Sequence, residues 1–571
     1  MKHRHKTYQR RNALMVFLLF AFVLTAMIGR LCYLMIVRAD HYGVQAKEIQ
    51  QRERRIKAKR GEIRDRNGKV LAGNKAVSTI SVIHSQVKEP EKVIRILAKE
   101  LKMDEDQIRR KVEKVSSREK IKSNVDKKTS DTIRDYGLAG VTVDEDDKRQ
   151  YPYGSLGSKV LGFTGADNQG IIGLEVSYEK FLKGIDGAIL TTTTAGGVEI
   201  ENGAEERVEP VSGQNLTTSL DVTIMQYADQ VANQILQKKK AKSVDIIVMN
   251  PNNGEIYAMA CAPEFDLNSP FEITGDTTSM TAKEKQDLRN QMWRNPCVSD
   301  TYEPGSTFKI LTSAAGIEKK VVTMNDHFFC PGYRIVEDRR IRCHKTTGHG
   351  SETFLQGIMN SCNPVFMDVG SRLGVHNFFE ELNQFQLMKR TGIDLPGEAA
   401  TIFHKEDKVG AVELATISFG QSFQISPVRL LASCSAIING GTSVTPHVGV
   451  STAREDGSYM KKFTYPGGSR VVSKETSDQI REALGKVVSE GTGKNAGVEG
   501  YEVGAKTGTS QKLPRGNGKY IASTLAFAPV SKPEVITLVR IDEPEGTYYG
   551  GTVAAPVVSQ LYTNLLPYIL K

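Results

Sequence analysis

The chain has 571 residues, 39% of them hydrophobic and 25% charged, which excludes both a single small domain and an intrinsically disordered protein. The formal net charge of +10 comes from scattered basic residues, which argues against a nucleic-acid-binding protein. The densest short basic cluster precedes an apolar run, a placement that points to a membrane, and comprises Lys2, Arg4, Lys6, Arg10 and Arg11.

A membrane anchor is predicted near the start of the chain. Residues 13–29 carry no charge, and after the single Arg30 the apolar character continues to Val37, which is long enough to span a bilayer. A cleaved signal peptide is the alternative, but the run is long for one and no convincing Ala-x-Ala site follows. The positive-inside rule then predicts a cytoplasmic tail (1–12), a membrane-spanning helix (13–37) and an extracytoplasmic remainder.

Residues 38–210 are predicted to form an elongated pedestal of mixed secondary structure. A strongly charged segment precedes RGEIRDRNGKVLA (residues 60–72), which has the polar turn of a hairpin between apolar positions. A charged, helix-like stretch follows from Glu89 to about Lys120. Residues 150–190 are rich in Gly and Tyr and are expected to be extended and mixed in structure.

A larger α/β domain is predicted for residues 211–571. It begins with LTTSLD (216–221), followed by a helix-like stretch to about Lys238 and by the strands VDIIVMN and EIYAMA around the turn PNNG. Two further strand-like segments, STLAFAPV and VITLVRIDEP, precede an apolar segment from about Val553 to Leu570. We expect that last segment to form a closing helix.

The first candidate for catalysis is EPGSTFK (residues 303–309), in which Pro and Gly precede a helix-like run. Ser306 begins the predicted helix, and Lys309 lies one turn further on the same face, so its amine can approach the serine hydroxyl. A serine is a poor nucleophile until a base removes its proton, and a desolvated lysine can be that base. The helix N-terminus adds N–H groups where an oxyanion would form.

The Ser-x-x-Lys spacing alone is weak evidence, because it occurs four more times in the chain. These copies lack the Pro-Gly turn and the apolar helix that surround Ser306, and a lone copy is usually part of a solvated surface. They are Ser85/Lys88, Ser117/Lys120, Ser177/Lys180 and Ser458/Lys461.

Two downstream elements strengthen the case for Ser306. SCN (residues 361–363) offers a hydroxyl and a carboxamide in one turn, although by itself it is better explained as a helix cap or an ordinary turn. KTGTS (residues 506–510) follows a strand-like segment, and a glycine on an edge strand would let a substrate backbone approach while Lys and Thr grip a carboxylate. Its alternative interpretation is a surface hairpin.

In this order within one predicted domain, the three elements match the Ser-x-x-Lys, Ser-x-Asn and Lys-Thr-Gly set of penicillin-binding proteins and serine β-lactamases. Together with RGEIRDRNGKVLA, GIIGLEVSYEKFLKG and LTTSLD, they make nearly the whole chain resemble the class B penicillin-binding proteins. The resemblance implies an α/β (α+β) transpeptidase domain with a central antiparallel sheet flanked by helices, an N-terminal pedestal and one transmembrane helix. It also implies a monofunctional serine D,D-transpeptidase that cross-links peptidoglycan.

The resemblance implies a role for each matching residue. Ser306 resembles the acylated nucleophile, Lys309 its general base, and Ser361 the proton relay to the leaving D-alanine. The family's oxyanion hole would be formed by the backbone N–H groups of Ser306 and Thr509. The residues implied in substrate binding and its electrostatic support are Asn363, Lys506, Thr507, Gly508 and Thr509.

Other functions within the same fold remain open. A β-lactamase or β-lactam sensor would share the catalytic domain, but neither needs the pedestal, and β-lactamases usually carry Asp where this chain has Cys362. A D,D-carboxypeptidase uses water as the acceptor, and the three elements do not exclude it. A bifunctional enzyme would need a glycosyltransferase domain of about 150–200 residues where the pedestal lies. A scaffold alone would not need the intact catalytic set.

No cofactor or metal is expected. Of the seven cysteines, Cys330 and Cys343 bracket a short loop that a disulfide could close, although free thiols fit at least as well. These two cysteines with His344 and His349 could also be zinc ligands, but their spacing matches no common zinc motif.

The resemblance also implies ligands, partners and a location. The ligands would be peptidoglycan stem peptides and β-lactam antibiotics, and the partner a SEDS-type glycan polymerase in the membrane. No nucleic acid is expected. The process favoured is septal division or spore-cortex synthesis over elongation, with the catalytic domain outside the cell membrane.

Overall fold

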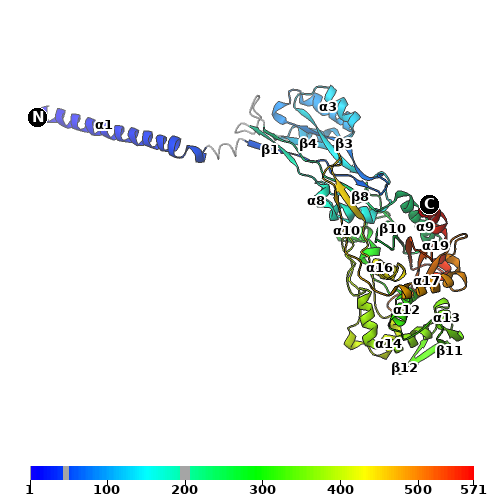
Figure 1. The fold of residues 1–571 in the computed structure, drawn as a ribbon. Helices are drawn as coiled ribbons and strands as arrows, with labels where there is room; N and C mark the ends of the chain where they lie inside the picture. Colours follow the sequence, from blue (N-terminus) through cyan, green and yellow to red (C-terminus); the bar gives the residue numbers. More distant parts are fainter. Residues whose placement is uncertain (1, 43–50, 117, 193–205, 571) are drawn as a thin grey trace. The chain divides into compact units, whose positions relative to one another are not determined.

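The computed structural model of the protein describes residues 2–42, 51–116, 118–192 and 206–570 (Figure 1). By its packing, the chain divides into two compact units. The first contains Met1–Lys59, Ala76–Lys148 and Ile185–Val211, and the second contains Arg60–Lys75, Arg149–Gly184 and Ser212–Lys571. Two parts of the predicted pedestal, residues 60–75 and 149–184, therefore belong to the unit that holds the predicted catalytic domain.

The predicted anchor is helical. Helix α1 (Lys2–Cys32) continues into a π-helical turn, η1 (Tyr33–Val37). The most apolar 18 residues within Arg10–Val37 have a mean hydropathy of 2.3, and none of them is buried. This segment is long and apolar enough to cross a membrane, as the sequence predicts. The charged segment expected after it lies partly outside the described residues.

The first unit contains two small sheets. Strands β1 (Gln51–Ile56), β6 (Gly187–Thr192) and β7 (Glu206–Val208) form one of them. In the other, β4 (Glu119–Val125) and β5 (Val141–Gln150) pair with the later part of β3 (Val70–Val82). Beside this sheet lie the helices α3 (Pro90–Leu101), α4 (Glu105–Val112) and α5 (Lys127–Asp135), with the 3₁₀ turn η2 (His84–Gln86).

The buried core of this unit accounts for the apolar face of its helix α3. Helix α3 buries Val93, Ile94, Leu97 and Leu101, which follow the spacing of one helix face, and this apolar stripe packs with Ile80 of β3. The charged, helix-like stretch predicted from Glu89 to about Lys120 forms two helices, α3 and α4. Its last expected residues, from Glu119, instead begin strand β4.

The second unit is built around a five-stranded antiparallel sheet. Every residue of its strands β10 and β19 is buried, so both faces of the sheet are covered by other elements. This confirms the predicted central antiparallel sheet. In spatial order the strands are β10 (Ile256–Ala262), β9 (Ser243–Met249), β19 (Val535–Asp542), β18 (Tyr520–Ala528) and β17 (Gly504–Gln511).

Helices from distant parts of the sequence pack against this sheet. Helix α9 (Val222–Lys239) contacts β9 and β10, and the closing helix α19 (Ala555–Ile569) contacts α9, β18 and β19. Helix α17 (Lys474–Ser489) contacts β17, α16 (Pro427–Ile438) contacts β19, and α12 (Lys309–Glu318) packs against both α16 and α17. The sequence predicts α9 and the closing helix correctly.

A second sheet of this unit includes the predicted hairpin. Strand β2 (Ile63–Arg64) pairs antiparallel with the first part of β3, and Asp65 closes the turn by accepting hydrogen bonds from the N–H groups of Asn67 and Lys69, each at 2.8 Å. The sheet continues through β8 (Asn215–Thr218), β15 (Gly449–Ala453) and β16 (Lys461–Lys462). Other helical elements of this unit are α6 (Ser158–Leu161), α7 (Gly173–Ser177), α8 (Glu179–Leu182), α10 (Ala282–Trp293), α11 (Pro296–Ser299), η4 (Glu406–Lys408), α15 (Ala411–Ile417), η5 (Lys494–Ala496) and α18 (Gly550–Val553).

A buried carboxylate joins segments that are far apart in the sequence. Glu175 accepts hydrogen bonds from Arg60 Nε at 2.6 Å, from Arg149 Nε at 2.7 Å and from the Tyr151 hydroxyl at 3.1 Å. The side chains of Glu175 and Arg60 are both fully buried. Burial alone would raise the pKa of Glu175, but the charges of Arg149 and Arg60 hold it below its usual value.

We expect Glu175→Gln to lower the free energy of unfolding by about 3–5 kcal/mol, because it removes the buried counter-charge that Arg149 and Arg60 share and leaves Arg60 with Glu179 alone. The single tryptophan, Trp293, lies in the same unit against the Phe163 ring, so its fluorescence can follow unfolding in urea. The control is Glu499→Gln at an exposed carboxylate, which should leave the midpoint nearly unchanged. Equal midpoints for the two variants would contradict the expectation.

Candidate active site

Ser306 lies in a tight 3₁₀ turn, η3 (Gly305–Phe308), that runs directly into α12. The regular helix therefore starts three residues later than the sequence predicts. Gly305 has a φ of +56°, and a Cβ there would lie 2.9 Å from the carbonyl oxygen of Thr509. The turn needs glycine because its backbone packs directly against strand β17.

The loop before Ser306 is fixed by an ion pair that the sequence analysis did not identify. Glu303 is buried and accepts hydrogen bonds from Arg515 at 2.6 Å and from the backbone N–H of Ser422 at 3.0 Å. The partners lie more than 100 residues away in the sequence, so local patterns gave no signal for them.

The Lys309 amine is buried and points to the Ser-x-Asn turn. Nζ donates hydrogen bonds to the carbonyl oxygen of Ser361 at 2.7 Å, to its Oγ at 3.3 Å and to Asn363 Oδ1 at 2.7 Å. Within the described residues these are its hydrogen bonds, so the free protein holds the amine on Ser361 and Asn363. Burial lowers the pKa of Lys309 to about 8, which makes the neutral amine accessible to proton transfer.

Ser361 occupies a strained turn between helices α13 (Phe354–Met359) and α14 (Asn363–Gln384). Its φ is +55°, a left-handed conformation that costs a non-glycine residue about 1–3 kcal/mol and is found mainly at functional sites. Cys362 is the N-cap of α14, and Asn363 is its first helical residue. The turn thus presents the hydroxyl of Ser361 and the amide of Asn363 from one rigid helix start.

Lys506 brings a second buried amine to the same hydroxyl. It is fully buried on β17, and its Nζ donates to Ser361 Oγ at 2.9 Å and to the carbonyl oxygen of Thr507 at 3.2 Å. Burial first, and then the charge of Lys309, lower the pKa of Lys506 well below its usual value. Two amines that compete for charge in a dry site favour the loss of one proton from the pair.

The structure explains the need for glycine at position 508 differently from the sequence-based prediction. A Cβ at this position would lie 2.6 Å from Ser523 Oγ and 3.0 Å from the carbonyl oxygen of Pro304. The protein's own loop before Ser306, and not only a substrate, therefore requires glycine here. Strand β17 is an edge strand of the five-stranded order, as the sequence analysis expected.

These elements line a cleft of about 600 Å³ in the second unit. The lysines of the predicted site, Lys309 and Lys506, are buried in the protein. The other six predicted residues line the cleft: Ser306, Ser361, Asn363, Thr507, Gly508 and Thr509.

One wall of the cleft is aromatic, and the sequence analysis missed it. The rings of Tyr520 and Tyr548 stack with centroids 3.8 Å apart, and Tyr549 lies 4.7 Å from Tyr548. The tyrosine pair is followed by Gly550 and Gly551, which also line the cleft. The Tyr-Tyr-Gly-Gly sequence that follows the last strand could have indicated this aromatic wall.

The other Ser-x-x-Lys copies lie elsewhere. Ser85 lies in the 3₁₀ turn η2, Ser177 ends α7 and Ser458 follows β15. The described residues that line the cleft include none of them. Ser117 lies outside the described residues.

All seven cysteines are free thiols. Of the two alternatives left open for Cys330 and Cys343, the structure therefore has the free thiols and not the disulfide.

Comparison with known proteins agrees with this geometry. Residues 245–563 match the penicillin binding protein transpeptidase domain, and residues 55–218 match the penicillin-binding protein dimerisation domain. Stage V sporulation protein D of Bacillus subtilis is 38% identical, over 98% of this chain and 86% of its own length. The peptidoglycan D,D-transpeptidase FtsI of Escherichia coli is 27% identical, over 95% of this chain and 89% of its own.

Solved structures share the fold. Penicillin binding protein 2X from Streptococcus thermophilus superposes with a TM-score of 0.76 at 23% identity, covering 90% of this chain and 80% of that chain. The transpeptidase match alone spans more than half of the chain, and it contains all three catalytic elements. The chain belongs to the class B penicillin-binding proteins.

Proposed function

We propose that this chain is a serine D,D-transpeptidase that cross-links peptidoglycan stem peptides, releases D-alanine and is acylated by β-lactams. The observation that carries the proposal is the convergence of two buried amines, from Lys309 and Lys506, on the Ser361 hydroxyl in the cleft that holds Ser306. The match to the transpeptidase family supports the same reaction.

In the acylation step, Ser306 Oγ attacks the carbonyl carbon of the penultimate D-alanine, and its proton passes to neutral Lys309. The bond to the nitrogen of the terminal D-alanine then breaks, and a proton delivered through Ser361 Oγ lets that residue leave as an amine. Lys309 hydrogen bonds to Ser361 in the free protein, and catalytic contacts of this kind commonly tighten only when substrate binds.

The negative charge on the carbonyl oxygen is stabilised by the backbone N–H groups of Ser306 and Thr509. The close packing of Gly305 on Thr509, which leaves no room for a Cβ, supports this pairing because it brings the two backbones together. Preorganised donors at such a position commonly contribute about 3–4 kcal/mol to transition-state stabilisation.

Substrate binding is assigned to the side chains around the nucleophile. Thr509 Oγ1 accepts a hydrogen bond from the Gly550 N–H at 3.0 Å, which leaves its own proton for a substrate carboxylate. Thr507 and the charge of Lys506 support the same carboxylate. Asn363 is held by Lys309 through Oδ1 and binds the donor peptide with its amide.

The acyl group on Ser306 then has two fates. Attack by the amine of a neighbouring stem peptide forms the cross-link and restores the serine, whereas attack by water gives only a shortened peptide. The class B family match favours the first, and the second would make the enzyme a D,D-carboxypeptidase.

The location and process follow from the anchor and the relatives. The chain is a single-pass membrane protein. We propose that residues 1–12 are cytoplasmic, 13–37 span the membrane, and the pedestal (38–210) and transpeptidase domain (211–571) lie outside. The names of the Bacillus subtilis and Escherichia coli relatives support a role in sporulation or septal wall synthesis. The family resemblance adds a SEDS-type glycan polymerase as the proposed partner in the membrane.

The test of the reaction uses the full chain with nascent glycan and its polymerase. We expect cross-linked dimers with the wild type, and neither dimers nor a covalent penicillin adduct with Ser306→Ala, because Ser306 is the only serine of the described Ser-x-x-Lys copies that lines the cleft. Ser177→Ala is the matched control from another Ser-x-x-Lys copy and should behave as wild type. Rapid release of D-alanine without dimers under every polymerase-coupled condition would establish the carboxypeptidase instead.

The rate of penicillin acylation should rise with pH through about 8, because neutral Lys309 is the base and its fraction grows as the pH passes its lowered pKa. Lys309→Arg keeps a cation that does not deprotonate in this range, so it should slow acylation by about 10²–10⁴-fold and abolish the rise. Stopped-flow labelling between about pH 6 and pH 9 measures both. A flat wild-type profile would exclude Lys309 as the base.

The orientation is tested with protease added outside intact spheroplasts. Residues beyond Val37 should be digested and a tag placed before Ala13 should stay protected, because the five basic residues that precede the apolar run retain that end in the cytoplasm. The same tag in lysed spheroplasts is the control for protease access. Digestion of the tag in intact cells would reverse the orientation.

A further inference from the structure

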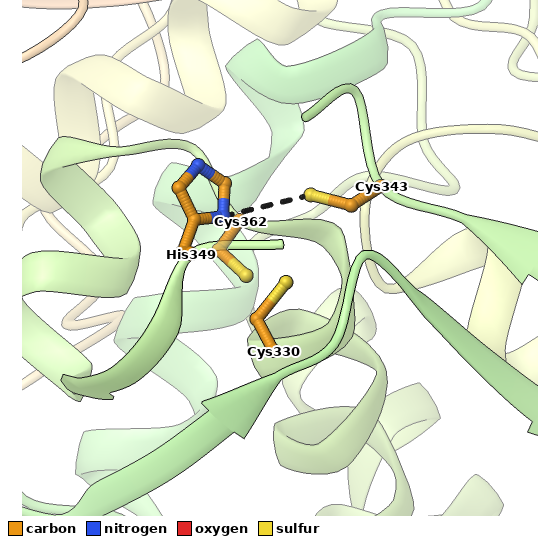
Figure 2. Close-up of side chains that lie close together, drawn as sticks. All are labelled: Cys330, Cys343, His349 and Cys362. Carbon is orange, nitrogen blue, oxygen red and sulfur yellow. Dashed lines mark hydrogen bonds between the residues drawn. The ribbon is translucent and has the colours of Figure 1, made fainter. Parts of the chain in front are cut away.

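Three cysteines and one histidine converge next to the active-site turn. Figure 2 shows Cys330, Cys343, His349 and Cys362 turned toward one another, and their ligand atoms all lie within 4.8 Å of one another. Cys343 Sγ and His349 Nδ1 are 3.7 Å apart. Tetrahedral zinc with Zn–S bonds of about 2.3 Å and Zn–N bonds of about 2.0 Å separates its ligand atoms by about 3.5–3.8 Å. A small inward movement would therefore complete the coordination.

We propose that Cys330, Cys343, His349 and Cys362 bind one Zn²⁺ ion. Three thiolates and an imidazole are a common ligand set for zinc, and soft sulfur ligands select it over the hard cations Mg²⁺ and Ca²⁺. Four protein ligands fill the tetrahedral shell, so the ion is structural and leaves no position for a reacting water. This replaces the sequence-based expectation of no metal, which considered His344 and omitted Cys362.

A buried carboxylate lies beside the cluster. Glu352 is 3% exposed, and its Oε1 has no hydrogen-bond partner among the described residues. That oxygen lies 3.9 Å from His349 Nδ1, while Oε2 is held by Asn360 at 3.0 Å. Carboxylates commonly lie beside zinc-bound histidines and help to orient the ring, and Glu352 lies in such a position.

The segment that supplies three of the ligands has almost no core of its own. Of residues 327–353, five are buried, and two of these are ligands: Phe328, Cys330, Gly332, Cys343 and Glu352. Folded segments with so little buried apolar surface usually depend on a metal or a disulfide. The two hairpin-like pairs in this segment are β11 (His327–Cys330) with β14 (Gly350–Thr353), and β12 (Tyr333–Val336) with β13 (Arg339–Arg342).

The fourth ligand connects this segment to the catalytic turn. Cys362 is the N-cap of α14, directly between Ser361 and Asn363. A bond from zinc to Cys362 therefore holds the left-handed conformation of Ser361 against its strain. This positioning effect rests on the proposed function, whereas zinc binding itself does not.

The full chain, purified in detergent without chelators after growth with zinc, is analysed for bound metal by mass spectrometry. We expect about one zinc per chain, and a loss of at least about 100-fold in zinc affinity for His349→Ala, because even outer-shell partners of a metal are worth 10–100-fold. Two matched controls should keep their zinc: His344→Ala, which removes the neighbouring histidine, and Cys434→Ser, which removes a buried cysteine outside the cluster. Absence of zinc from the wild type, or its retention in His349→Ala, would overturn the proposal.

Because a ligand variant can fail to fold, a second measurement uses the wild type. Replacement of zinc by Co²⁺ should produce the sulfur-to-cobalt charge-transfer absorption of a tetrahedral thiolate site. After denaturation with a chelator all seven cysteines should react with a thiol reagent. Two unreactive cysteines within the cluster would instead identify a disulfide and overturn the zinc assignment.

A third measurement separates this proposal from the proposed function. Chelation should slow penicillin acylation of the wild type, and added Zn²⁺ should restore the rate. If zinc is bound but penicillin never labels Ser306, the function fails and the metal site stands. If penicillin labels Ser306 at full rate in protein shown to be free of metal, the positioning role of the ion is wrong.

Discussion

The catalytic unit depends on the removal of two lysine amines from water and their placement on one serine hydroxyl. Lys309 and Lys506 are each 1% exposed or less, and both donate hydrogen bonds to Ser361. Desolvation lowers both pKa values, so the site favours fewer than two charges. The energy of holding amines in this state must come from the folding of the surrounding elements.

Those elements come from three separated regions of the chain. Helix α12 supplies Lys309, the turn between α13 and α14 supplies Ser361, and the edge strand β17 supplies Lys506. The central sheet makes their meeting possible, because strand β9 from the start of the unit pairs with β19 from its end. The long stretch between these strands is thereby enclosed within one core, and both Ser306 and Ser361 lie on it.

Regular segments were the part of this fold that could be predicted from sequence. The apolar anchor, the hairpin turn at Asp65, strands β9 and β10 and the closing helix all have local signals of hydrophobic spacing or turn residues. The order of three short motifs likewise predicted which serine lies in the cleft. Local patterns say nothing about distant contacts, so they missed the partners of Lys309, the aromatic wall and the convergence of Cys362 with His349. Nor do local patterns show that residues 60–75 and 149–184 of the predicted pedestal pack in the same unit as the five-stranded sheet.

The packing around Gly508 limits how this protein can change under antibiotic selection. The space that a side chain would fill is already occupied by Ser523 and by the loop that carries Ser306, so a larger residue displaces Ser523 or that loop. In the proposed mechanism a β-lactam and the natural peptide react with the same Ser306 hydroxyl, so such a change would harm both reactions together. Mutations that reduce the reaction with a β-lactam but preserve wall synthesis must therefore lie where the β-lactam and the peptide differ in shape. Such positions lie at the outer rim of the cleft and not at Gly508.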